Sequence, residues 1–342
     1  MLFNQGGTAE CPFVPETKGF FVIRYFIDEK GEDNTMGIEP TPWIWSNGEL
    51  VPWDEVCVHV AAHALHYGSS VFEGIRAYAT PRGPAVLGLE PHVRRLFDSC
   101  RIYRMPIPYQ PEEISQAIRD TIRANELQAC YIRPLVFRGV GTFSLDGRAD
   151  CPVDVAICTI AMGEYLGAEG LREGVDVGVS SWQRMAPNTF PALAKIGGQY
   201  VNSQLIAMEA HDRGFVEAVV LNAAGNVSEG SGENIFLVKD EVLSTPPLAA
   251  SVLPGINRRF VIQLARDLGY QVREETIARE MLYLADEIFF TGTAAEITPI
   301  RSVDGIKVGE GRCGSVTAHL QTQFFGLVKG EQEDRFGWMT LV

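Results

Sequence analysis

One lysine of this chain lies in a setting unlike that of the others. Only six lysines occur among 342 residues, and five of them lie beside an acidic residue or in a glycine turn. Lys195 instead lies in the apolar, tightly turned segment Pro-Ala-Leu-Ala-Lys-Ile-Gly-Gly at 191–198. An amine there is partly desolvated, which favours the neutral nucleophile and permits an imine with a carbonyl compound. The alternative is a lysine that extends from a helix start into solvent, and the local context leaves both open.

Three further turns could hold an acid or bind an anion. Residues 227–234 form a Gly-rich segment with two carboxylates, Glu229 and Glu233, which we interpret as a turn between strands. Residues 253–258 open a predicted helix, and residues 291–296 follow a predicted strand. Free backbone N–H groups at such turns bind phosphate well, although each turn could equally be an ordinary loop or a capped helix. With the lysine, this set fits pyridoxal phosphate, which needs an imine-forming amine, an acid near its ring nitrogen and a phosphate site.

The elements expected to position these groups alternate along the chain. Asn47-Gly48 predicts a tight hairpin over 43–51, and apolar spacing predicts helices around 93–100 and 114–122. We expect further strands at 19–26, 130–137, 152–161, 175–181, 216–221, 234–238 and 287–291, a hairpin at 303–308, and helices at 195–212, 255–268 and 316–324. Gly269 should end the second of these helices as a left-handed cap. The pattern indicates a two-domain α+β fold. We place an N-terminal extension at 1–36, a small α/β domain at 37–160, an interdomain linker at 161–172 and a large cofactor-binding domain at 173–342.

Composition excludes several classes of function. The chain carries 29 basic and 43 acidic residues, and this net charge of −14 is the opposite of the basic face that nucleic-acid binding requires. No apolar run approaches the roughly 18 residues of a membrane-spanning helix, and the stretch at 19–26 lacks the basic region of a signal peptide. Seven scattered cysteines without a Cys-x-x-Cys pair indicate reduced thiols and a cytoplasmic location. His59, His63 and His66 lack an acid or cysteine at ligand spacing, so we expect no metal.

Six segments, in order, carry a family resemblance. They are HALHYGSSVFEGIRAY (63–78), YIRPL (131–135), AKIGGQYVNS (194–203), SEGSGEN (228–234), LPGI (253–256) and TGTAAEITP (291–299). On these segments the chain resembles the class IV aminotransferases of pyridoxal-phosphate fold type IV, a fold like that of D-amino-acid aminotransferase, and within them the branched-chain amino-acid aminotransferases. The resemblance implies reversible amino transfer between L-leucine, L-isoleucine or L-valine and 2-oxoglutarate.

The resemblance also implies a role for each matching residue toward pyridoxal phosphate. Lys195 would hold the cofactor as an aldimine and move the proton between the substrate Cα and the cofactor. Tyr200 would bind the phenolic oxygen of the ring, and Glu229 would pair with the ring nitrogen. Arg95 and two turns would bind the phosphate, the turn residues being Leu253, Gly255, Ile256, Asn257 and Thr293. Many relatives carry threonine where this chain has Asn257, whose amide could replace the hydroxyl contact.

The substrate pocket implied by the resemblance accepts both an apolar side chain and a second carboxylate. Tyr131 and the backbone amides of Thr293 and Ala294 would bind the α-carboxylate. Arg133 would bind the distal carboxylate of glutamate, and Arg76 would support this network or serve the structure. The apolar walls would be Phe72, Tyr67, Tyr165 and Leu145. Tyr67 and Leu145 would act across the interface of a homodimer, whose further assembly is left open. A bulky aromatic is common near Met162 in relatives, so we expect a roomier pocket here.

Two alternatives remain at this point. A D-amino-acid or amine transaminase shares the fold, but such relatives arrange their carboxylate-binding arginines differently, and Tyr131-Ile-Arg133-Pro favours the L-branched-chain enzyme. A non-catalytic binding module could keep the fold. The retention of Lys195, Glu229 and Arg95 together argues against that module.

Overall fold

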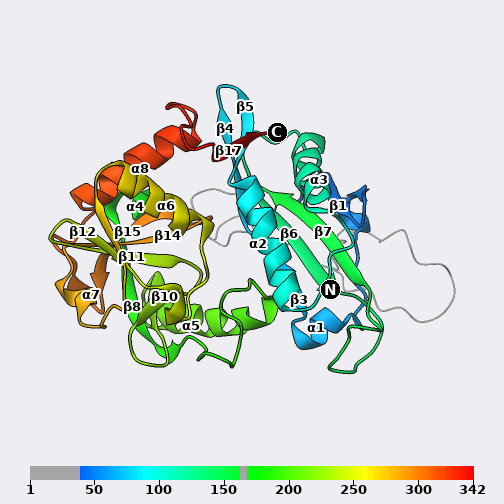
Figure 1. Cartoon of the computed structure of the whole chain (residues 1–342), viewed down its shortest axis with the longest axis horizontal. Helices are drawn as coiled ribbons and strands as arrows, with labels where there is room; N and C mark the ends of the chain where they lie inside the picture. Colours follow the sequence, from blue (N-terminus) through cyan, green and yellow to red (C-terminus); the bar gives the residue numbers. More distant parts are fainter. Residues whose placement is uncertain (1–38, 162–167) are drawn as a thin grey trace, which may run out of the picture.

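The described residues, 39–161 and 168–342 of this computed structural model, form two lobes that lie side by side, each built on one sheet (Figure 1). The sheet of the first lobe has the strand order β17 (Met339–Leu341), β5 (Gly83–Leu87), β4 (Ile75–Thr80), β6 (Cys130–Arg138), β7 (Val153–Ile160), β1 (Trp43–Ser46) and β2 (Glu49–Pro52), with β3 (Ser70–Phe72) paired to β6. The sheet of the second lobe has the order β10 (Val227–Gly230), β9 (Glu217–Leu221), β8 (Val175–Gln183), β15 (Glu296–Val303), β14 (Glu287–Gly292), β11 (Asn234–Lys239), β12 (Val242–Thr245) and β13 (Gln271–Glu274), with β16 (Ile306–Lys307) paired to β15.

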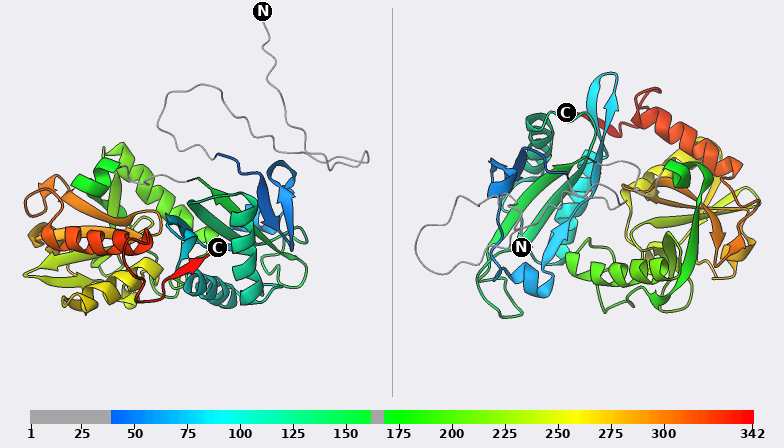
Figure 2. Two further views of the ribbon diagram at one scale, coloured as in Figure 1. Left: turned by 90° about the horizontal axis from the view of Figure 1, so that it is seen from above. Right: turned by 180° about the vertical axis from the view of Figure 1, so that it is seen from behind.

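The first lobe packs two amphipathic helices on an antiparallel sheet. Its helices are α1 (His63–Tyr67), α2 (Leu89–Ile102) and α3 (Pro111–Ala124), with a 3₁₀ turn at Trp53–Glu55. Leu96 of α2 and Ile118 of α3 are fully buried against sheet residues such as Ile132. Asn47 and Gly48 both have positive φ in the β1–β2 turn, which confirms the predicted hairpin. The α2 helix lies between this sheet and the second lobe (Figures 1 and 2).

The second lobe covers its sheet on both faces. Its helices are α4 (Ala168–Glu173), α5 (Tyr200–Asp212), α6 (Ile256–Asp267), α7 (Met281–Leu284) and α8 (Ser315–Val328), with 3₁₀ turns at Gly197–Gln199 and Leu248–Ala250. Phe260 of α6 and Leu320 of α8 share one buried cluster with the stacked rings of Phe236 and Phe289. Helix α6 ends before Gly269, whose φ of +87° suits glycine, as predicted for its cap.

The two lobes are joined by apolar packing, and the last strand of the chain belongs to the first lobe. Tyr78 and Leu87 of the first sheet belong to the same buried cluster as Phe260 and Trp338. The last strand, β17, returns to the first sheet and pairs with β5, although it follows the whole second lobe in the sequence. The predicted large domain, 173–342, includes this strand. The predicted domain boundaries remain a prediction.

Most predicted elements inside the described residues are confirmed. The strands near 130, 152, 175, 216, 234 and 287, the 303–308 hairpin and all five predicted helices are present, within a few residues at their ends. The helix predicted from Lys195 begins later, because residues 197–199 form a 3₁₀ turn before α5. The predicted strand at 19–26, Met162 and Tyr165 lie outside the described residues. No described helix has the length and apolarity needed to cross a membrane.

Candidate active site

Lys195 lies where the two lobes meet, in a segment fixed by its backbone. Its N–H donates to Ser99 Oγ of α2 at 3.0 Å, and its carbonyl accepts from the N–H of Phe72 at 3.1 Å. The following Gly197-Gly198 turn packs closely on the first lobe. A Cβ on Gly197 would lie 2.2 Å from Ser70 Oγ, so a larger residue there would force the Ser70 hydroxyl to move.

The Lys195 amine points between two aromatic rings. Its Nζ donates to the Tyr200 hydroxyl oxygen at 2.6 Å and lies 4.7 Å from the centroid of the Phe72 ring. Tyr200 begins α5 one turn after the lysine, so local chain geometry alone brings the pair together. The structure thus places together the two residues that the sequence assigns to the cofactor aldehyde and its neighbouring phenolic oxygen.

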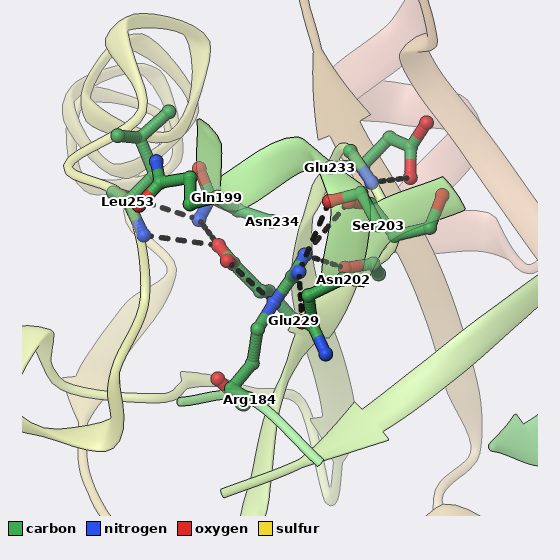
Figure 3. A network of polar contacts seen from close by, with 12 residues as sticks. Arg184, Gln199, Asn202, Ser203, Glu229, Glu233, Asn234 and Leu253 are labelled. Atoms are coloured by element: carbon green, nitrogen blue, oxygen red, sulfur yellow. Dashed lines mark hydrogen bonds and ion pairs between the residues drawn. The ribbon is translucent and has the colours of Figure 1, made fainter. Parts of the chain in front are cut away.

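Glu229 is held by three donors at the other side of the same region. Its Oε1 lies 3.0 Å from Arg184 Nε, and its Oε2 accepts from Asn234 Nδ2 at 3.2 Å and from the Leu253 N–H at 3.0 Å (Figure 3). Burial raises the pKa of this carboxyl, while the Arg184 guanidinium opposes that rise. The prediction of a turn at this residue is wrong. Glu229 lies on strand β10, whose register with β9 shifts between Val227 and Glu229. The strand includes Gly230, and only residues 231–233 connect it to β11.

Arg95 is oriented by a fully buried acid. Its Nε and Nη2 donate to the two oxygens of Glu73 at 2.7 and 2.8 Å, and its Nη1 donates to the Pro254 carbonyl of the second lobe at 3.0 Å. His92 Nδ1 contacts the same carboxylate at 2.8 Å. Burial alone would raise the pKa of Glu73, but the ion pair with Arg95 and the contact with His92 lower it well below its usual range. Arg95 and Glu73 therefore form an ionised pair that links the two lobes.

A cavity with about 550 Å³ of empty volume runs between these groups. Its lining includes Gly74, Arg95, Tyr131, Lys195, Glu229, Gly232, Glu233, Asn234, Leu253, Gly255, Ile256, Asn257, Arg258, Thr291, Gly292, Thr293 and Ala294. The first turn of α6 lies here without a side-chain cap, so its N–H groups are available to an anion. Asn257 Nδ2 donates to the Gly292 carbonyl at 2.7 Å, while its buried Oδ1 has no partner among the described residues.

The predicted substrate residues fall into two groups. Tyr131, Thr293 and Ala294 line the cavity, and Arg133 is attached to this group because its Nη2 donates to the Tyr131 hydroxyl at 2.7 Å. The Arg133 guanidinium also lies 4.6 Å from the centroid of the Phe72 ring.

The other predicted residues lie away from the cavity lining. Arg76 pairs with Glu296 at 3.4 Å, and Tyr67 and Leu145 are exposed by 41% and 83%. The prediction that Tyr67 and Leu145 act across a dimer interface stays a prediction.

A family model and a relative of known name show which family the chain belongs to. Residues 70–303 match the family model described as amino-transferase class IV. The chain is 52% identical over 307 residues to the branched-chain-amino-acid aminotransferase of Escherichia coli (strain K12), covering 90% of this chain and 99% of the relative. The chain belongs to the class IV aminotransferases. Its fold is accordingly pyridoxal-phosphate fold type IV.

Solved structures of class IV aminotransferases agree in fold over nearly the whole chain. A crystal structure of the E. coli branched-chain amino acid aminotransferase has a TM-score of 0.86 at 53% identity, covering 87% of this chain and 98% of the other. A second branched-chain amino acid aminotransferase, from T.th. and complexed with N-(5'-phosphopyridoxyl)-L-glutamate, has a TM-score of 0.84 at 41% identity, covering 89% and 99%.

Two parts of this class IV site were missed by sequence reasoning. Arg184 binds Glu229 and also donates to the carbonyls of Gly230 and Ser231 at 2.6 and 2.7 Å, but one arginine among 23 gives no sequence signal. Glu73 lies inside a recognised segment, and its signal was present. An acid with apolar residues on both sides, as in Val71-Phe72-Glu73-Gly74-Ile75, is a candidate for a buried ion pair.

Proposed function

We propose that this protein transfers the amino group between L-branched-chain amino acids and 2-oxoglutarate, with pyridoxal 5'-phosphate as the cofactor. The observation that carries the proposal is the Lys195 amine, placed between Tyr200 and Phe72 on a cavity that also contains Glu229 and the uncapped start of α6. The names of the relatives, and the phosphopyridoxyl-glutamate bound by one of them, support it.

The residues present fit pyridoxal phosphate. Its phosphate would be bound by the first turn of α6, by the turn at Thr293 and by Arg95, which the Glu73 carboxylate holds in place. Glu229 would hold the ring nitrogen, and its raised pKa suits a carboxyl that shares a proton with that nitrogen. When bound, the cofactor supplies an aldehyde for amines and a ring that accepts electrons from the substrate Cα.

Within this site Lys195 would act twice. Its amine would attach the cofactor, and once released by the incoming amino acid it would take the proton from the substrate Cα and return it to the cofactor carbon. Tyr200, 2.6 Å from Nζ, would orient the amine and hydrogen-bond the phenolic oxygen of the ring. Phe72 lies on the other side of the amine, with its ring centroid 4.7 Å from Nζ.

The substrate end combines apolar and cationic groups. Tyr131 and the amides of Thr293 and Ala294 would bind the α-carboxylate that all substrates share. Phe72 would contact the branched side chain, while Arg133 beside it would bind the distal carboxylate of glutamate. One site would thereby accept both leucine and glutamate, as the two half-reactions require.

A homodimer and a cytoplasmic location complete the proposal. Exposed apolar side chains gather near α1 and after β6, including Leu65, Tyr67, Val140, Phe143 and Leu145. Such a patch is typical of a surface that a second subunit covers. The Tyr67 hydroxyl donates to the Phe143 carbonyl at 2.9 Å, which fixes part of this surface in one shape.

The experiment compares amino donors with 2-oxoglutarate as acceptor. L-Leucine, L-isoleucine and L-valine should each react, and D-alanine and simple amines should react far more slowly. Addition of leucine should shift the absorption of the yellow protein. A preference for D-alanine would favour the D-amino-acid alternative, and a colourless, inactive protein would favour the non-catalytic module.

A further inference from the structure

A second cavity lies next to the cofactor cavity and shares part of its lining. Its empty space, counted together with open solvent, is about 470 Å³. Its lining comprises Arg184, Met185, Phe190, Ala192, Gln199, Tyr200, Ser203, Glu229, Ser231, Gly232, Ser251 and Leu253. Glu229, Gly232 and Leu253 line both cavities, whereas Lys195 and Arg95 line only the first and Tyr200 only the second. Glu229 and Leu253 therefore mark the border between the two spaces.

The chemistry of the cofactor ring predicts which of its edges faces the second cavity. In pyridoxal phosphate, carbon C2, which carries a methyl group, lies between the ring nitrogen and the carbon that carries the phenolic oxygen. The proposed function, on which this inference rests, assigns the ring nitrogen to Glu229 and the phenolic oxygen to Tyr200. Both residues line the second cavity, while the lysine that takes the aldehyde and the arginine that takes the phosphate do not. With the ring held in this way, the C2 edge would face the second cavity.

We propose that this cavity is a subsite for the C2 substituent of the cofactor, open to pyridoxal phosphate analogues with a short alkyl chain in place of the methyl group. Met185, Phe190, Ala192 and Leu253 provide apolar contacts for such a chain. The space that the centre of a water-sized sphere can occupy there is about 40 Å³, compared with the roughly 10–15 Å³ that one water molecule needs on the same measure. An ethyl or propyl chain adds only one or two carbon atoms, which this space can hold.

The walls of this subsite differ in rigidity. Arg184 is fixed by Glu229 and by hydrogen bonds to Asn202 Oδ1 and Ser203 Oγ, both at 3.1 Å, so that wall cannot retreat (Figure 3). Met185 has an adaptable side chain. Ala192 has the smallest side chain on the apolar wall, so enlarging it should fill the space without moving Arg184 or Glu229.

The test is reconstitution of the full-length protein, freed of cofactor, with pyridoxal phosphate and with its 2-ethyl and 2-propyl homologues. Dissociation constants are read from the imine absorbance, independently of turnover. In the wild type the ethyl homologue should bind within about threefold of pyridoxal phosphate, because each buried methylene contributes favourably. In Ala192→Leu the propyl homologue should bind at least about tenfold more weakly, with pyridoxal phosphate unchanged. Ala186→Leu, which adds the same bulk outside both cavities, should leave all three constants unchanged.

Each outcome decides the inference. A wild type that binds the ethyl homologue more than tenfold more weakly than pyridoxal phosphate has a closed C2 edge, and this result overturns the subsite even if Ala192→Leu fails to fold. Equal binding of the propyl homologue by wild type and Ala192→Leu would place the substituent elsewhere. Failure of pyridoxal phosphate itself to form an imine would overturn the proposed function, and the subsite with it.

Discussion

Arg133→Gln should separate the two substrates of the proposed reaction. Arg133 is exposed, lies beside Phe72 and donates to the Tyr131 hydroxyl at 2.7 Å, so its remaining N–H groups are available to a carboxylate at the substrate end of the site. A hydrogen bond to a charged group contributes about 1.5–3 kcal/mol, or about 10- to 150-fold in rate. Because Arg133 is exposed, we expect the lower part of that range for glutamate and 2-oxoglutarate.

Leucine has no distal charge and should lose only what the Tyr131 contact contributes. That hydrogen bond also involves the charged guanidinium and contributes at most about 1.5–3 kcal/mol, and both substrates use Tyr131, so this loss cancels in the ratio. The assay measures the single-turnover half-reaction rates of glutamate and leucine in variant and wild type. Tyr131→Phe is the matched control, because it removes the same hydrogen bond, keeps the cation and should slow both substrates equally. Equal losses in Arg133→Gln would refute the reasoning and direct the search for the donor site to Arg76.

Three further changes test other parts of the site. Glu229→Gln should bind pyridoxal phosphate nearly as well but slow proton removal from leucine by at least the roughly tenfold that a lost charge-assisted hydrogen bond implies, as measured in single turnovers; normal turnover would assign the role to Glu233 or to no carboxylate. Glu73→Gln leaves Arg95 buried without its counter-charge and should lower the free energy of unfolding in urea by about 3–5 kcal/mol at pH 7. Because the folded-state pKa of Glu73 is lowered, its stabilisation is full above pH 4.5 and is lost as pH falls below that value, so wild type and Glu73→Gln should converge in stability in acid. Gly197→Ala would place a Cβ 2.2 Å from Ser70 Oγ, so the Ser70 hydroxyl must move, and we expect the crowding beside Lys195 to reduce imine absorbance at saturating cofactor; Gly214→Ala, with open space at its Cβ but a φ of +81°, should cost stability only.

Local patterns predicted most of the elements, because apolar periodicity and turn residues act over a few positions. The β1–β2 hairpin followed from Asn47-Gly48, and the end of α6 followed from Gly269. Strand β17 was not predicted, because three residues carry no periodicity and its partner β5 lies far earlier in the sequence. Residues 227–234 were interpreted as one turn, although 227–230 form β10, since the number of glycines alone does not say where a strand ends.

Some residues of the candidate site could be found from the sequence, and others could not. Lys195 could be found because it contrasts with five other lysines, whereas Tyr200 was found only through the resemblance to class IV aminotransferases. Arg184 and His92 act through distant partners, Glu229 and Glu73, and no local pattern distinguishes them from other buried residues. Contacts made between the two lobes, such as Arg95 to Pro254, exist only once both are folded.

The attachment of the cofactor to Lys195 is the central claim, and borohydride reduction tests it most directly. The protein is loaded with pyridoxal phosphate, reduced, digested and mapped by mass spectrometry. The phosphopyridoxyl group should be found on the peptide that contains Lys195, and Lys195→Ala should fold but take up no label and transfer no amino group. A label on any of the other five lysines, or labelling that persists in Lys195→Ala, would contradict the account.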